Sequence, residues 1–232
     1  MFEDCTSLVT PPILPATTLA DHCYYRMFFG CTSLIEAPAL PATTLADYCY
    51  YQMFYNCTSL TKAPAILPAT TLIENCYWSM FQNCTSLVNA PQLPATTLAH
   101  ACYWSMFQNC TSLITAPELP VAITSYNQTY VDMFDGCTSL NYIKCLLIFD
   151  ISDRSNYTSM WVRNVAPTGI FVKADNMDNW TIGDDGIPTG WVVYTETEWR
   201  LRNAETQSDW NESDDNSIAY IRNKPTISQI AE

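Results

Sequence analysis

Basic residues are scarce in this chain of 232 residues, where 10 Lys and Arg stand against 23 Asp and Glu and give a net charge of −13. Because each contact with a nucleic-acid phosphate requires a Lys or Arg, we expect no nucleic-acid partner. No run of 18 apolar residues occurs, and Met1 is followed by Phe-Glu-Asp-Cys instead of a basic region and an apolar core. We therefore expect no membrane insertion, and no signal peptide is visible.

Residues that hold metals or perform catalysis are also scarce. The only histidines, His22 and His100, lie three repeat units apart, and no Cys-x-x-Cys accompanies them. Asp184 and Asp185 lack the alternating ligands and closing Glu of a calcium loop. No Gly-x-Ser-x-Gly is present, and acidic residues form no recurring pair. We therefore predict a protein that is not an enzyme and that binds no metal and no cofactor.

The most regular feature present is the tetrapeptide Cys-Thr-Ser-Leu, which begins at residues 5, 31, 57, 84, 110 and 137. The resulting spacing of 26 or 27 residues lies within the roughly 20 to 29 residues of leucine-rich repeats. In such repeats each unit supplies a short strand and a helical segment. The predicted fold class is therefore α/β: a leucine-rich-repeat solenoid of five stacked coils, with short parallel strands on one side and helices on the other.

One unit, residues 31 to 56, illustrates the expected local structure. Leu34 to Ala37 is the predicted strand, and Pro38 and Pro41 end it because proline cannot donate to a sheet. Thr44 is the predicted helix N-cap, with Asp47 completing a capping box. The same device is expected at Thr18 with Asp21 and at Thr71 with Glu74. The helices are expected to end at residues that tolerate a left-handed conformation, namely Asp4, Gly30, Asn56, Asn83, Asn109 and Gly136.

The expected core follows from a 3.6-residue helical wheel, which places Leu45, Ala46, Cys49, Tyr50 and Met53 on one side. The eleven cysteines fall in the Cys-Thr-Ser-Leu column, in a mid-helix column at residues 23, 49, 76 and 102, and at residue 145. Within a unit, two of them lie about 12 Å apart along the helix, beyond disulfide reach. We predict reduced, buried thiols, with pairing between neighbouring coils left as the alternative.

A second column of the wheel points away from this core and contains Tyr25, Tyr51, Trp78 and Trp104. Tyr and Trp offer large rigid surfaces with a polar tip, so this column is the predicted ligand-binding site. Carbohydrate is one expected ligand, because flat aromatic faces pair with sugar rings. Two alternatives stay open: each ring packs against the next helix, or the ligand binds the strand side, from Ile35-Glu36 to Asn141-Tyr142.

Both ends of the array depart from the repeat. Met1-Phe2-x-x-Cys5 matches Met27-Phe28-x-x-Cys31, so the chain is expected to begin in the last turn of a helix, with further protein covering that end. Beyond Leu140 we predict a helix from Asp153 to Val165, a strand at Gly169 and a β-hairpin cap ending near Tyr194. The expected domains are a repeat array over 1–140, a capping region over 141–200 and a polar connector or oligomerisation segment over 201–232.

The motifs Leu-Pro-Ala-Thr-Thr-Leu, Cys-Tyr-x-x-Met-Phe and Cys-Thr-Ser-Leu recur across residues 1 to 140. In these motifs the chain resembles the BspA-like leucine-rich repeats of surface proteins from anaerobic bacteria and their phages. The stretch Gly169-Ile-Phe-Val-Lys followed by Gly186-Ile-Pro-Thr-Gly-Trp191 is similar to the segment that closes such arrays. The resemblance implies a leucine-rich-repeat scaffold and a role in binding or adhesion.

Two further motifs, Asp209-Trp-Asn-Glu and Ala219-Tyr-Ile-Arg-Asn-Lys-Pro, resemble a connector of phage tail-fibre and receptor-binding proteins. This resemblance implies a virion component of the tail or surface that recognises a host cell-surface protein or glycan. Its termini would contact other virion proteins, and homo-oligomerisation is left open. The alternatives are a leucine-rich-repeat adhesin on a bacterial cell surface and a purely structural spacer within an assembly.

Overall fold

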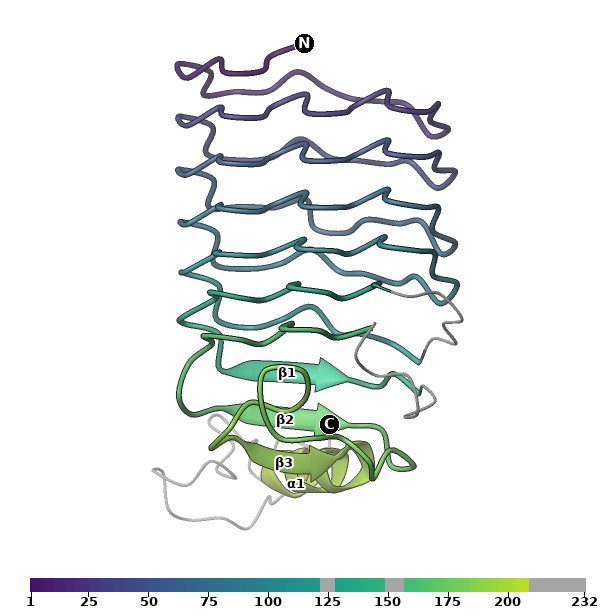
Figure 1. Cartoon of the computed structure of the whole chain (residues 1–232), viewed down its shortest axis with the longest axis vertical. Helices are drawn as coiled ribbons and strands as arrows, with labels where there is room; N and C mark the ends of the chain where they lie inside the picture. Colours follow the sequence, from purple (N-terminus) through teal and green to yellow (C-terminus); the bar gives the residue numbers. More distant parts are fainter. Residues whose placement is uncertain (122–127, 149–156, 209–232) are drawn as a thin grey trace, which may run out of the picture.

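The computed structural model describes residues 1–121, 128–148 and 157–208, without the side chains of the last five. The chain forms a flat stack of coils, with the N-terminus at one end and strands β1 (Tyr142–Cys145), β2 (Ile170–Lys173) and β3 (Val192–Thr195) near the other (Figure 1). These strands form one parallel sheet in the order β1-β2-β3. Helix α1 (Glu196–Ser208) follows β3. The predicted solenoid with parallel strands is therefore confirmed.

On the strand side, the earlier coils are joined by isolated bridges instead of continuous strands. Glu36, Lys62, Asn89, Thr115 and Tyr142 form consecutive parallel bridges from one coil to the next. Ala37 adds a backbone hydrogen bond of 2.9 Å to the carbonyl of the Lys62 residue. Longer strands do not form there, because the prolines that follow lack the donor that a ladder needs. The predicted strand from Leu34 to Ala37 is confirmed in this short form.

The opposite side of each coil is not helical, so the predicted repeat helices are wrong. Every fourth residue there has a left-handed backbone, for example Tyr48, Gln52 and Asn56 with φ of 54°, 50° and 59°. The amide of Tyr51 donates a hydrogen bond of 3.2 Å to the carbonyl of Tyr48 in the same turn. The amide of Gln52 instead donates one of 3.0 Å to the carbonyl of Trp78 in the next coil. This alternation of tight turns and inter-coil bonds defines the turn segments, which span residues 21–31, 47–57, 74–84, 101–110 and 128–137.

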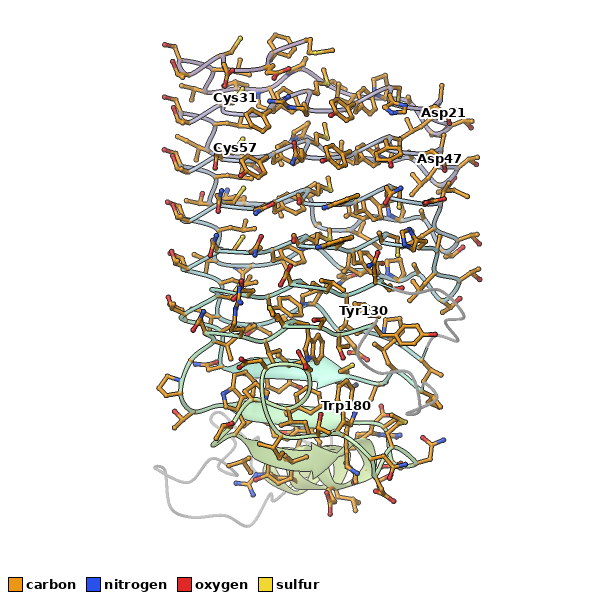
Figure 2. All side chains as sticks on the ribbon, viewed as in Figure 1. Asp21, Cys31, Asp47, Cys57, Tyr130 and Trp180 are labelled. Atoms are coloured by element: carbon orange, nitrogen blue, oxygen red, sulfur yellow. The ribbon has the colours of Figure 1, made fainter. Side chains whose placement is uncertain are left out.

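The predicted capping boxes are wrong for the same reason. Thr18 and Thr44 form a parallel bridge between coils. The carboxylate of Asp21 accepts a hydrogen bond of 3.3 Å from the backbone amide of Asp47 in the next coil. In Figure 2, Asp21 and Asp47 lie one above the other at one edge of the stack. The Asp21 carboxylate therefore joins two coils, and neither acid caps a helix.

Burial in the turn segments repeats every four residues. Cys49 with Tyr50 and Met53 with Phe54 point inward and are almost fully buried, and the outward pair between them begins at Tyr51. Leu45, Cys49, Tyr50 and Met53 are therefore buried as predicted. Ala46 is only half-buried, and the helical wheel missed Phe54. A strict period of four is the signature of linked turns, not of a 3.6-residue helix.

The core consists of columns of like side chains stacked along the solenoid axis. The rings of Phe28, Phe54, Phe81, Phe107 and Phe134 follow one another at centroid separations of 5.3 to 5.8 Å. The Cys57 thiol donates a hydrogen bond of 3.1 Å to the carbonyl of Phe28, and the equivalent cysteines 31, 84, 110 and 137 repeat this contact. Each thiol therefore satisfies a buried carbonyl while filling the core.

All eleven cysteines are free thiols, and nine of them are buried. The prediction of core cysteines is therefore confirmed at nine positions. It is wrong for Cys5 and Cys23, which are exposed in the first coil. Figure 2 shows the buried Cys31 and Cys57 in adjacent coils, at the edge of the stack away from Asp21 and Asp47.

The residue before each Cys-Thr-Ser-Leu has the predicted left-handed backbone, although it ends a turn segment and not a helix. Asn83 donates a side-chain hydrogen bond to Asn56 at 2.8 Å, and Asn109 donates one to Asn83 at 2.9 Å. At Gly136, with φ of 75°, a Cβ atom would collide with the side-chain oxygen of Asn109. Glycine is required there because the asparagine column passes over its backbone.

The C-terminal region corrects two predictions and adds one element. The expected hairpin is wrong, because β3 pairs with β2 in parallel and so adds another coil. The expected helix from Asp153 to Val165 lies partly outside the described residues, and its described part contains turns with left-handed Met160 and Asn164. The helix that does form, α1, crosses the expected domain boundary at residue 200. Residues 209–232 lie outside the described residues.

Helix α1 begins with a capping box that the sequence reasoning overlooked. The Thr195 hydroxyl accepts a hydrogen bond of 3.2 Å from the Glu198 amide, and the Glu198 carboxylate accepts one of 2.7 Å from the Thr195 amide. Trp199 then packs against Tyr142 and Tyr194 at 5.6 and 5.5 Å. The helix therefore covers the outer face of the sheet. Among the described residues, no helix is long and apolar enough to cross a membrane.

Candidate binding surface

Tyr25, Tyr51, Trp78 and Trp104 form one continuous column on the outward side of the turn segments, here called the aromatic column. All four side chains are half-buried. The structure therefore brings the four predicted site residues together and directs them away from the core, as expected. Their scaffold is a set of linked turns instead of the expected helices.

The rings of the aromatic column stack on one another along the solenoid axis. Tyr25 lies 4.9 Å from Tyr51 and 5° from parallel, and Trp78 lies 4.6 Å from Trp104 and 4° from parallel. Between these pairs, Tyr51 and Trp78 meet edge to face at 5.4 Å and 74°. The flat faces are consequently occupied by neighbouring rings. The polar groups at the ring edges are the Tyr25 and Tyr51 hydroxyls and the Trp78 indole N–H, because the Trp104 indole N–H is donated to Asp132.

A second outward column runs beside the first and changes character along the axis. It begins with Phe29 and Tyr55, which stack at 4.8 Å. It continues with Gln82, whose side-chain amide donates a hydrogen bond to the side chain of Gln108. The Gln108 amide in turn donates a hydrogen bond of 3.0 Å to the Asp135 carboxylate. The sequence reasoning did not single out these residues. Their position after each Met-Phe pair was the available signal, because that pair points inward and the next two residues point outward.

A charged cluster lies at the C-terminal end of this surface. Arg163 clamps Asp135 with two hydrogen bonds, of 3.0 and 2.7 Å. Burial alone would raise the pKa of Asp135, but the hydrogen bonds from Arg163 and Gln108 outweigh it and lower that pKa below its usual value. For Asp132, burial raises the pKa first and the nearby Asp135 charge raises it further, against a hydrogen bond from Trp104. This cluster fixes the end of the aromatic column.

At the N-terminal end of the surface, the positively charged Arg26 side chain is held by two contacts. Arg26 forms an ion pair of 2.7 Å with Glu3, and its guanidinium lies 3.8 Å from the centre of the Phe29 ring. His22 adds another ring, stacked on Tyr48 at 5.0 Å. Tyr, Trp and Arg are the residue types that carry most binding energy at protein interfaces.

The described residues include few polar groups placed to hold a metal ion or to react. Among the described residues, no group of three or more His, Cys, Asp and Glu side chains could hold a metal ion. Burial raises the pKa of the Cys49 thiol to about 12, which keeps it protonated and unreactive at neutral pH. Burial likewise raises the pKa values of Tyr77 and Tyr103 well above the ordinary value. The core groups that could react are therefore held neutral inside the stack.

The strand side, the rival surface considered from sequence, contains a hollow and charged side chains that pair between coils. A hollow of about 350 Å³ is lined by Val9, Thr10, Pro11, Ile35, Glu36 and Ala37. Lys62 pairs with Glu36 at 3.5 Å, and Lys144 pairs with Glu118 at 2.9 Å. This side therefore presents apolar surface with little unpaired charge.

The repeated units and the parallel bridges between them define the class of protein, a parallel solenoid built from 26- or 27-residue repeats. No family model and no curated protein matches the sequence. A solved structure, the leucine-rich repeat protein of T. pallidum, is similar with 14% sequence identity over 87% of this chain and 82% of that chain, at a TM-score of 0.34. Overlap at that level carries no argument about function, which has to be inferred from this chain's own residues.

Proposed function

We propose that the protein is a non-enzymatic binding module that contacts a host cell surface through the aromatic column. The observation that supports the proposal is the continuity of Tyr25, Tyr51, Trp78 and Trp104 over four coils, outward and half-buried. Stacking holds these large side chains in place before a ligand arrives, which reduces the entropy lost on binding. The protein has a net charge of −13, and an uncharged ligand would form no ion pairs with it. Contacts with the aromatic column would then be the main source of affinity.

Ring stacking changes the expected mode of recognition. Because Trp78 and Trp104 occupy each other's faces, a sugar ring cannot lie between them without separating the pair. The Tyr25 and Tyr51 hydroxyls and the Trp78 indole N–H can donate hydrogen bonds to a ligand, whereas the Trp104 indole N–H is already donated to Asp132. The ligand we propose therefore presents hydrogen-bond acceptors along an extended surface, as a glycan or a protein on the host cell does.

The proposed setting is the tail or surface of a virion, with the termini joined to other virion proteins. Support for this setting comes from the connector-like motifs at Asp209 and Ala219, which lie outside the described residues. An adhesin on a bacterial cell surface uses the same binding column and differs only in its anchor. A structural spacer needs no ligand at all. Neighbouring genes for capsid or tail proteins favour the virion, whereas a signal peptide on a longer parent chain favours the adhesin.

Binding to intact cells separates a binding module from a spacer. Fluorescently labelled protein would be mixed with a panel of intact bacterial strains and measured by flow cytometry, with labelled serum albumin as the control. The proposal expects saturable binding to some strains, competed by unlabelled protein. Labelling no greater than that of albumin across the whole panel would favour the spacer.

A further inference from the structure

The cysteines of the Cys-Thr-Ser-Leu column direct their thiols towards the preceding coil. In the first pair of this column, the thiol of Cys31, labelled in Figure 2, donates a hydrogen bond of 3.0 Å to the carbonyl of Phe2. The backbone amide of Cys5 donates to the same carbonyl, also at 3.0 Å. The Cys31 sulfur and the Cys5 backbone therefore surround one oxygen atom, which places these two cysteines side by side.

The backbones around this pair are in register for a covalent bond between them. The amides of Phe2 and Asp4 donate to the carbonyls of Met27 and Phe29, at 3.0 and 2.7 Å. Backbones joined by a parallel ladder of this kind lie about 4.8 Å apart. The Cα atoms of a disulfide are usually about 4.4 to 6.8 Å apart. A disulfide between neighbouring members of the column thus requires little movement of the backbone.

The two thiols differ in exposure, and the exposed one gives an oxidant access to the pair. Cys5 is exposed, whereas Cys31 and the four later cysteines of the column are buried. Burial raises the pKa of the Cys31 thiol to about 11, so few Cys31 side chains are thiolates at neutral pH. The Cys5 side chain is free to turn about its Cα–Cβ bond towards Cys31. Oxidation of the pair therefore begins at Cys5.

We propose that Cys5 and Cys31 form a redox staple, in which a small disulfide such as oxidised glutathione converts the two thiols into one disulfide. The Cys5 thiolate attacks one sulfur of oxidised glutathione and releases the first glutathione thiolate. Cys31 then attacks the Cys5 sulfur of this mixed disulfide and releases the second. The thiol protons pass to the two departing glutathione thiolates. Two protein thiols are oxidised, one oxidised glutathione is reduced, and without such an oxidant both cysteines stay free.

Cys23, the other exposed cysteine, shows why this pair differs from the rest. It precedes the buried Cys49 by one repeat, as Cys5 precedes Cys31. The Cys49 thiol, however, forms its hydrogen bonds with backbone groups of its own turn segment, at Ala46, Cys49 and Tyr50. Because that sulfur is directed along its own coil, Cys23 should stop at the mixed disulfide with glutathione.

The staple would fasten residues 1–5 to the turn segment 21–31. These residues are otherwise held by non-covalent contacts, such as the stacking of Phe2 on Phe28 at 5.7 Å and the ion pair of Glu3 with Arg26 at 2.7 Å. A disulfide that closes one repeat of 26 residues restricts the open chain and limits local detachment of this segment. It leaves the aromatic column unchanged, so the staple is independent of the proposed function.

Peptide mapping of the Cys23→Ser chain tests the bond. In this variant Cys5 is the only thiol of the tryptic peptide 1–26, and Cys31 lies in the next peptide, 27–62. Folded protein would be treated with oxidised glutathione, denatured in acid with N-ethylmaleimide and digested. Mass spectrometry should show the two peptides joined, with fragmentation placing the bond at Cys31.

The matched control adds Cys31→Ser to the same chain, because serine keeps a donor for the carbonyl of Phe2. This control should retain one glutathione on Cys5 and contain no joined peptides. Glutathione left on Cys5 when Cys31 is present would overturn the staple. A bond from Cys5 to Cys49, or a disulfide between two chains, would overturn it as well.

Hydrogen exchange at the Asp4 amide gives the second readout. This amide donates to Phe29 at 2.7 Å, so its exchange reports detachment of residues 1–5. Oxidation of the Cys23→Ser chain should slow the exchange by about tenfold or more, and the control with Cys31→Ser should show no change. Joined peptides without slower exchange would show that the bond does not fasten the segment, and the staple would be wrong.

Discussion

The indole rings of Trp78 and Trp104 lie 4.6 Å apart between centroids and 4° from parallel, one coil above the other. The same contact makes the pair a structural element of the stack and the largest aromatic surface of the proposed site. Function and stability are therefore coupled at these residues. Tests of binding have to separate the two effects.

Energetic coupling between the two tryptophans is the first prediction. Trp78→Ala and Trp104→Ala should each lower the free energy of unfolding, by about 1 to 3 kcal/mol because the rings are only half-buried. The double variant should lose less than the sum, by about 0.5 to 1.5 kcal/mol, since each single change already breaks the stack. Urea unfolding measures all four chains. Additive losses, like those expected for the distant pair Tyr25→Ala and Trp104→Ala, would show that the stacking is not energetically significant.

The second prediction concerns cysteine reactivity. Native protein treated with iodoacetamide at neutral pH should be labelled at Cys5 and Cys23 and spared at the nine buried positions. Burial raises the pKa of the thiols of Cys49 and Cys102 to about 12, so the reactive thiolate is absent as well as inaccessible. Denatured, unreduced protein should show eleven alkylated thiols by mass spectrometry. Pairs missing from that number would reveal disulfides between coils.

The third prediction tests the four-residue burial pattern. Phe54→Ala should cost about 3 to 5 kcal/mol, because the ring is fully buried between Phe28 and Phe81 and its removal leaves a cavity. The neighbouring outward residue provides the control, since Tyr55→Ala should cost clearly less. A 3.6-residue helix would not distinguish the two in this way. Equal losses in thermal unfolding would contradict the inward assignment of Phe54.

Much of this architecture can be read from the sequence, because the repeat spacing fixes which residues stack on one another. The burial of Cys49, Tyr50 and Met53 was predicted correctly, since a helix and a chain of turns place these residues on the same side over a short span. The backbone itself could not be predicted. Gln52 and Tyr48 adopt a left-handed conformation that they rarely favour, at a cost of about 1 to 2 kcal/mol each. Hydrogen bonds to the next coil offset that cost, and local preference does not reveal them.

The C-terminal end shows a second limit of sequence reasoning. A strand followed by Gly190 and another strand indicates a hairpin, yet the two strands pair in parallel because the chain completes a whole coil between them. The capping box at Thr195 and Glu198 had the same form as those proposed for the repeats. Among the described residues, no coil follows α1 and competes for its backbone amides, so the box can form here. The aromatic column could be predicted because its outward residues occupy the same position in successive repeats. The stacking of its rings on one another could be seen only in the structure.

The fourth prediction is a pH dependence centred on Asp135. Its pKa is lowered in the folded state, so its interactions stabilise the fold above the unfolded pKa of about 3.9 and are lost as the pH falls through the folded value. Asp135→Asn should therefore lower the melting temperature at pH 7 but have little effect at about pH 2. Asp132→Asn is the control, because burial raises that pKa and its loss should cost less at pH 7. A constant deficit for Asp135→Asn at both pH values would show that its charge does not matter.

The most direct test of the proposed binding surface is cell attachment by the Trp78→Ala/Trp104→Ala variant, measured on strains that bind the parent protein. Phe54→Leu provides the matched control, because it weakens the core of the coil next to that of Trp78 while leaving the aromatic column in place. Both variants would be assayed well below their melting temperatures and compared by flow cytometry. We expect the tryptophan variant to lose attachment while Phe54→Leu retains it. Attachment by a folded tryptophan variant at the level of the parent would contradict the assignment of the aromatic column as the binding surface.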